Sequence, residues 1–71
     1  MASHWTAAAI GTINGVNRLF RTPVPYRTDT VQPIRNGQWL KDSWTELGSD
    51  KVRMEYAPEV GDQLLLQYIP L

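Results

Sequence analysis

The sequence predicts an all-β protein, a small antiparallel β-sandwich or partly open barrel of about six to seven short strands with an N-terminal arm. Turn-forming residues recur so often that no uninterrupted window is long enough for a packed helix. The segments between them are rich in β-branched and aromatic residues. Residues 51–57 alternate apolar and charged side chains, as in a strand with one wet face. We expect an arm over residues 1–9 and a single β domain over residues 10–71.

The expected arm, MASHWTAAA, has neither strand alternation nor the capping residues of a helix. Trp5 is its largest side chain. A tryptophan on a free arm is suited to anchor a partner protein, and the alternative is that Trp5 folds back onto its own core.

Two short strands are expected at residues 11–14 and 18–22, on either side of Asn14-Gly15, followed by a loop over residues 23–28. Asn36-Gly37 is the strongest turn signal, because both central residues of a type I′ turn need positive φ. This hairpin would place Arg35 opposite Gln38, Ile34 opposite Trp39, and Pro33 opposite Leu40. Pro33 cannot donate a ladder hydrogen bond, which predicts an edge strand or a bulge.

The second half of the sequence predicts three further strands. Residues 44–47 can pair with residues 51–57 through a turn at 48–50, and residues 58–62 reverse the chain again. The last strand, residues 63–69, has Leu64, Leu66 and Tyr68 on one face and Leu65 and Ile69 on the other. A strand that is apolar on both faces is expected to be central or covered by a partner.

Composition argues against several classes of ligand. There are no cysteines and one histidine, His4, so neither a disulfide nor an ordinary zinc site is expected, and no cofactor motif is present. The formal net charge is zero, which argues against nucleic acid or an anionic membrane as the main partner. The apolar runs are too short to cross a membrane, and no targeting segment is visible.

No enzyme is expected. His4 lies on the expected arm, where it could not form an oriented triad. Glu55 and Glu59 belong to a wet strand face and a turn, and a chain this small offers no deep cleft to raise the pKa of a carboxyl group. We therefore expect no catalytic residues and no small-molecule substrate.

We expect the chain to function by binding other proteins, because it is rich in aromatic residues and these are enriched in protein interfaces. The candidate interface residues are Trp5, Tyr26, Trp39, Trp44 and Leu71. Two other functions stay open. Tyr26, Trp39 and Trp44 would form a sugar-binding platform if exposed on one face, but the favoured interpretation places Trp39 and Trp44 in the hairpin core. A cluster of arginines and aromatics is typical of single-stranded nucleic-acid binders: Arg18, Phe20, Arg21, Tyr26 and Arg27.

Self-association is also expected. A chain of 71 residues buries a small core and gains stability from oligomerisation or from docking on a larger body. Residues 1–36 carry a net charge of +3 and residues 37–71 carry −3. Such a dipolar subunit could assemble head to tail. The favoured interpretation is that strands from both halves interleave, so that the asymmetry vanishes in space.

Three motifs carry a resemblance to a known type of module. Asn14-Gly15-Val16-Asn17 leads to Phe20 and Thr22-Pro23, residues 30–40 form a strand–Asn-Gly–strand unit, and Ala57-Pro58 precedes Gly61-Asp62 and Leu64–Tyr68. In order and spacing these stretches resemble a small β-sandwich module of tailed-bacteriophage virion structural proteins. The likeness runs from about Ile13 to Leu71, with Pro33 and the 23–28 loop as departures.

The resemblance implies a non-catalytic structural subunit of a tailed-phage virion, of minor capsid, neck, tail or fibre-attachment type. It would be made in the host cytoplasm and reside in the virion. Its implied partners are other virion proteins and further copies of itself, and the family offers no catalytic residues to carry over.

Overall fold

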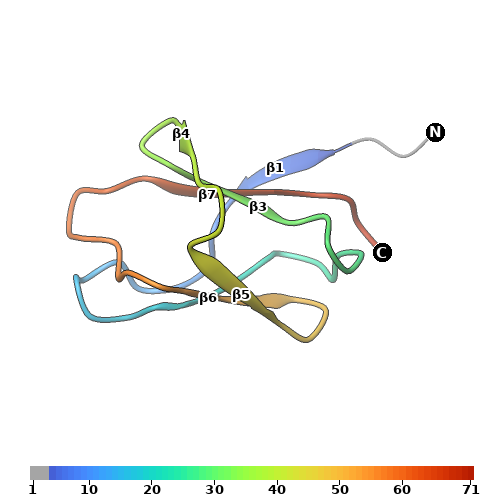
Figure 1. Ribbon diagram of the computed structural model, residues 1–71, viewed down its shortest axis with the longest axis horizontal. Coiled ribbons are helices and arrows are strands. Elements are labelled where there is room, and N and C mark those ends of the chain that lie inside the picture. Colours follow the sequence, from blue (N-terminus) through green and yellow to red (C-terminus); the bar gives the residue numbers. More distant parts are fainter. Residues whose placement is uncertain (1–3) are drawn as a thin grey trace.

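A computed structural model describes residues 4–71 of the chain (Figure 1). These residues contain seven strands and no helix, so no described segment is a helix able to span a membrane. The strands are β1 (Trp5–Ala8), β2 (Leu19–Arg21), β3 (Gln32–Arg35), β4 (Gln38–Trp39), β5 (Trp44–Leu47), β6 (Lys51–Met54) and β7 (Leu64–Tyr68).

The strands form two antiparallel sheets, with order β1-β7-β3-β4 in one and β2-β6-β5 in the other. Two isolated bridges add to these ladders: Ile10 pairs with Arg21, and Tyr26 pairs with Pro70. The Ile10 bridge therefore links the end of β1 in one sheet to β2 in the other. The predicted all-β class, a small sandwich or partly open barrel, is confirmed.

The core fills the space between the sheets. Phe20, Val52 and Leu66 are completely enclosed, and each such side chain contributes roughly 1.5–3 kcal/mol of burial free energy. The rest of the buried cluster is Tyr26, Val31, Met54, Leu64 and Tyr68. The expected alternation is confirmed within β6 and β7, because Val52, Met54, Leu64, Leu66 and Tyr68 point inward while Lys51 and Arg53 are exposed. The strand expected over residues 51–57 ends at Met54, and Tyr56, expected on its apolar face, is exposed.

The hairpin at Asn36-Gly37 has the predicted register, with Ile34 opposite Trp39 and Arg35 opposite Gln38. Both turn residues have positive φ, 52° and 81°, as a type I′ turn requires. The Leu40 N–H donates to the Pro33 carbonyl over 3.1 Å, in agreement with the predicted position of Pro33 opposite Leu40.

The edge or bulge predicted from Pro33 is wrong, because β3 lies inside its sheet between β7 and β4. In an antiparallel ladder the N–H and C=O of one residue point to the same side. The Pro33 carbonyl accepts from Leu40, the residue after β4, so the Pro33 nitrogen also lies on the β4 side. Because proline has no N–H, the Leu40 carbonyl receives no backbone hydrogen bond from Pro33. The side-chain amide of Gln32 donates to the Leu40 carbonyl in place of that N–H. A proline is tolerated here because the neighbouring glutamine supplies the donor.

Other boundaries differ from the expectation. Residues 5–8, expected in the arm, form β1 and pair with β7, and residues 1–3 of that arm lie outside the described residues. Strand alternation was not visible in WTAA, because three small side chains need no burial pattern to sit at a sheet margin. Residues 11–14 do not form a strand, and only Ile10 bridges to β2.

Candidate protein-binding surface

The outer face of the four-stranded sheet carries a continuous row of apolar side chains. Leu64, Leu66 and Tyr68 point inward, so Leu65 points outward. The register aligns Leu65 with Ala8 on one side and with Ile34 on the other, and Ile34 with Trp39. We call these four residues, Ala8, Leu65, Ile34 and Trp39, the apolar row. It crosses all four strands.

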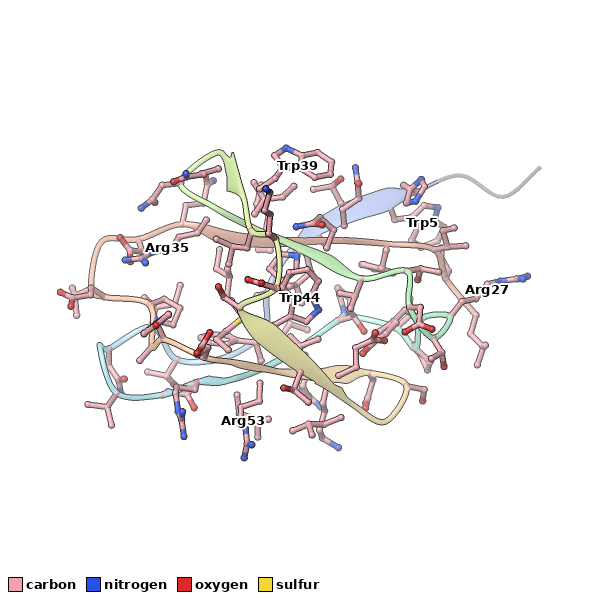
Figure 2. All side chains as sticks on the ribbon, in the orientation of Figure 1. Trp5, Arg27, Arg35, Trp39, Trp44 and Arg53 are labelled. Carbon is pink, nitrogen blue, oxygen red and sulfur yellow. The ribbon has the colours of Figure 1, made fainter. Side chains whose placement is uncertain are left out.

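Burial along the apolar row is uneven. Ile34 is only 7% exposed although it lies outside the cluster between the sheets, whereas Trp39 is 56% exposed. Figure 2 shows Trp39 standing on the side of the sheet away from the interior. The apolar row is therefore a small second hydrophobic cluster that is exposed to solvent at Trp39. Tryptophan is a residue type that commonly anchors protein interfaces. The neighbouring row, Thr6, Gln67 and Gln32, is polar.

Trp5 and Tyr26, two predicted interface residues, are brought together through Tyr68. The ring of Tyr68 lies 6.5 Å from each of their ring centroids, in tilted arrangements typical of aromatic pairs. Trp5 is 54% exposed at the open end of this series.

Tyr26 is not an interface residue of the folded chain, which corrects the prediction. It is buried, and its hydroxyl donates to the Lys51 carbonyl over 3.1 Å. Burial, followed by the nearby Glu46 carboxylate, raises the pKa of Tyr26 to about 12. The loop that holds Tyr26 folds inward because its backbone bonds to Ser49 and bridges to Pro70. This contact between distant segments has no local sequence signal.

Trp44 packs half-buried against the core from β5, in the other sheet from Trp39 (Figure 2). The three-ring platform required of a sugar-binding module is therefore not formed, because Tyr26 is buried and Trp44 faces the interior. Trp44 lines an open hollow of about 340 Å³ over β5 and β6. Its rim brings together two arginines and two carboxylates: Arg18, Arg53, Asp42 and Glu55.

Leu71 is 79% exposed, and its N–H donates to the Pro25 carbonyl over 3.0 Å. The C-terminal end and the start of β1 lie at the same end of the molecule (Figure 1). The five predicted residues thus do not form one surface. Trp5 and Leu71 lie at one end, Trp39 on an outer sheet face, and Tyr26 and Trp44 against the core.

The three-stranded sheet has a basic outer face. Arg21 and Lys51 are neighbours across β2 and β6, and Arg53 follows on β6. The Asp50 carboxylate lies 3.8 Å from the Lys51 ammonium. Phe20 and Tyr26, the aromatics that a single-strand binder would need for base stacking, are both buried. This face offers positive charge without the stacking platform of single-stranded nucleic-acid binders.

The motif residues behind the phage resemblance hold turns together. The Asn14 carboxamide accepts from the N–H groups of Val16 and Asn17, and the Gly15 N–H donates to the Pro58 carbonyl over 2.8 Å. The first and last motifs are therefore in direct contact.

A second set of bonds joins the Asn36-Gly37 turn to the turn before β7. Asp62 accepts hydrogen bonds from Asn36 at 3.0 Å, from the Glu59 N–H at 2.8 Å and from Arg35 at 2.9 Å. The Asn36 bond and the Glu59 backbone bond are the main causes that hold the pKa of Asp62 below its usual value. We call this set the Asp62 clamp. Its residues support the fold.

Sequence reasoning did not assign Ile34, Leu65 or Ala8 to a surface. The sequence did contain a signal for Leu65 and for Ile34. Leu65 belongs to the final strand, which was expected to be apolar on both faces, and Ile34 was expected opposite Trp39. Ala8 could not be placed because β1 itself was not expected.

Within residues 4–71, no group of three His, Asp or Glu side chains is arranged to hold a metal ion. In comparisons with protein-family models, with curated proteins and with solved structures, no match to the chain was found.

Proposed function

We propose that this chain is a non-catalytic structural subunit of a tailed-phage virion, of minor capsid, neck, tail or fibre-attachment type, which binds another virion protein through the apolar row. The single observation that carries the binding role is the half-exposed Trp39 beside the buried Ile34. The virion assignment rests on the sequence resemblance of the three motifs.

The apolar row is suited to a protein partner because of its chemistry and its position. Trp39 and Leu65 flank Ile34, and no charged side chain lies in the row. A partner that covers Trp39 removes apolar area from water and leaves no buried charge unpaired. The row lies on a regular sheet, so its side chains are already ordered before binding.

Recovery of the chain from particles tests the virion assignment. We expect mass spectrometry of gradient-purified particles, from the phage that encodes this chain, to detect the chain at a constant ratio to the major capsid protein. Absence of the chain from particles that are otherwise complete would contradict the assignment.

Substitution of Trp39 tests the binding surface. Trp39→Ala removes an interface anchor, and truncation of such an anchor costs about 2 kcal/mol or more, or roughly 30-fold in affinity. We expect the variant to be depleted from particles in competition with the unmodified chain. Tyr56→Ala is the matched control, because Tyr56 is 68% exposed and lies outside the apolar row. Equal incorporation of both variants, with circular dichroism showing that both are folded, would argue against this surface.

A further inference from the structure

The margins of the two sheets differ in how they are protected against pairing with another strand. Most natural edge strands are short, carry charges or are otherwise covered, because free N–H and C=O groups can template a new strand. On β4 the edge is only two residues long. On β5 the inward-facing Glu46 provides a charge. On β2 the Asn17 side chain bonds both the N–H and the carbonyl of Leu19.

The outer edge of β1 has none of these protections. Its sequence, Trp-Thr-Ala-Ala, contains no charge and no proline. The Ala9 N–H bonds to Leu64 of β7, and by the alternation of the ladder Ala7 and Trp5 also turn toward β7. The N–H and C=O groups of Thr6 and Ala8 therefore point away from the sheet, and both residues are exposed.

Prolines stop β2 from covering this edge. The Ile10–Arg21 bridge starts an antiparallel register in which Ala8 would face Pro23 and Thr6 would face Pro25. Neither proline has an N–H to donate. The N–H of Thr22, between the bridge and Pro23, turns the other way and donates to the Asp50 carbonyl, 3.0 Å away. Beyond the bridge the two segments diverge, as Figure 1 shows, and the β1 edge stays open within residues 4–71.

We propose that the β1 edge pairs with the β1 edge of a second copy of this chain, antiparallel about a two-fold axis at Ala7. In this register Thr6 lies opposite Ala8 of the second copy, and Ala8 lies opposite its Thr6. Every outward N–H on one edge then meets an outward C=O on the other, so that no free backbone group remains between Thr6 and Ala8. The ladder stops there because Ile10 is already paired with Arg21.

The side chains also favour a second copy as the occupant. Ala7 meets Ala7 across the axis, and the large Trp5 lies opposite the small Ala9 of the second copy. No charged side chain stands in β1, and the net charge of the chain is zero, so two copies approach without like-charge repulsion. The two four-stranded sheets join into one continuous sheet. The inference does not rest on the virion assignment, because self-association is measured on the purified chain.

Amide hydrogen exchange followed by NMR tests the proposal on the unmodified chain. A contact this small predicts half-dissociation between about 10 µM and 1 mM. As concentration rises through the dimer transition seen by sedimentation, exchange at Thr6 and Ala8 should slow at least tenfold. Exchange at Ala7 and Ala9, already bonded to β7, should change less than twofold.

Ala8→Pro removes one donor from the outer edge and leaves the ladder to β7 intact, and it should weaken the dimer at least tenfold. Ala8→Ser keeps the N–H and should stay within twofold of the unmodified chain. If Ala8→Pro does not fold, the exchange measurement still decides. A monomer at 1 mM, or a dimer in which Thr6 and Ala8 exchange as in the monomer, would overturn the proposal. Trp39→Ala, tested above for particle binding, should dimerise normally, so failure of either proposal is seen separately.

Discussion

The hydrogen bond from Gln32 to the Leu40 carbonyl predicts a measurable coupling between Gln32 and Pro33. The Gln32 amide donates to Leu40 and, over 2.9 Å, to the Pro33 carbonyl. Gln32→Ala removes both bonds and leaves the half-buried Leu40 carbonyl without its donor. An orphaned polar group costs about 1–3 kcal/mol, and half-burial places this site near 1–1.5 kcal/mol. For a domain of this size, the melting temperature should fall by roughly 4–12 °C.

Pro33→Val tests whether Gln32 stabilises the sheet because it replaces the N–H that Pro33 lacks. Valine at this position offers a backbone N–H directed at the Leu40 carbonyl, so the glutamine is no longer needed as a substitute donor. In the Pro33→Val background, Gln32→Ala should cost less than about 0.5 kcal/mol. The coupling free energy between the two sites is then about 1 kcal/mol, measured by a double-mutant cycle in urea with circular dichroism.

Gln67→Ala is the matched control. Gln67 lies beside Gln32 in the same polar row and is also half-buried, so its loss should cost less than about 0.5 kcal/mol. If Gln32→Ala costs the same amount in the unmodified chain and in the Pro33→Val background, the glutamine does not replace the proline's N–H. The explanation for a proline inside the sheet would then be wrong.

Three further predictions concern the core, the Asp62 clamp and the buried tyrosine. Gly11→Ala should destabilise the chain by about 1–3 kcal/mol in thermal unfolding, because a Cβ would lie 2.6 Å from Cδ1 of Phe20; an unchanged melting temperature would contradict this close approach. The lowered pKa of Asp62 contributes stability that is present above about pH 4 and is lost as pH falls through the folded-state pKa. Asp62→Asn should flatten that acid limb of stability against pH, and an identical limb would exclude the clamp as its source. The pKa of Tyr26, raised to about 12 from 10.0, contributes stability below pH 10 that is lost between pH 10 and 12. Tyr26→Phe should remove this alkaline loss and cost about 0.5–1.5 kcal/mol at neutral pH, so persistence of the loss would assign it to another group.

Elements defined by neighbouring residues were predictable from the sequence. Asn36-Gly37 determines a two-residue turn, and a two-residue turn determines the register on both sides, so Ile34 was paired correctly with Trp39. The alternation around Val52 and Met54 identified the inward face of β6. The apolar residues on both faces of β7 indicated a central strand, and β7 lies between β1 and β3.

The candidate site was only partly predictable. Trp39 was identified as an interface candidate from its residue type, and the structure leaves it half-exposed. Its neighbours in the apolar row come from three other strands, and their alignment depends on pairings between residues far apart in the chain. Tyr26 had the same residue-type signal for an interface, but a backbone contact with the β5–β6 turn places it in the core.

Residue types and their spacing were enough to predict the all-β class, the turn positions and the alternation within β6 and β7, because these follow from φ preferences and side-chain periodicity over a few residues. Three features could be seen only in the folded chain: residues 5–8 join a sheet, a proline sits inside one, and some aromatic residues are buried while others are exposed. Those outcomes depend on hydrogen bonds and packing between segments that are distant along the chain. Local propensity carries no information about such partners, because the partner that satisfies a backbone group is chosen only when the sheets come together.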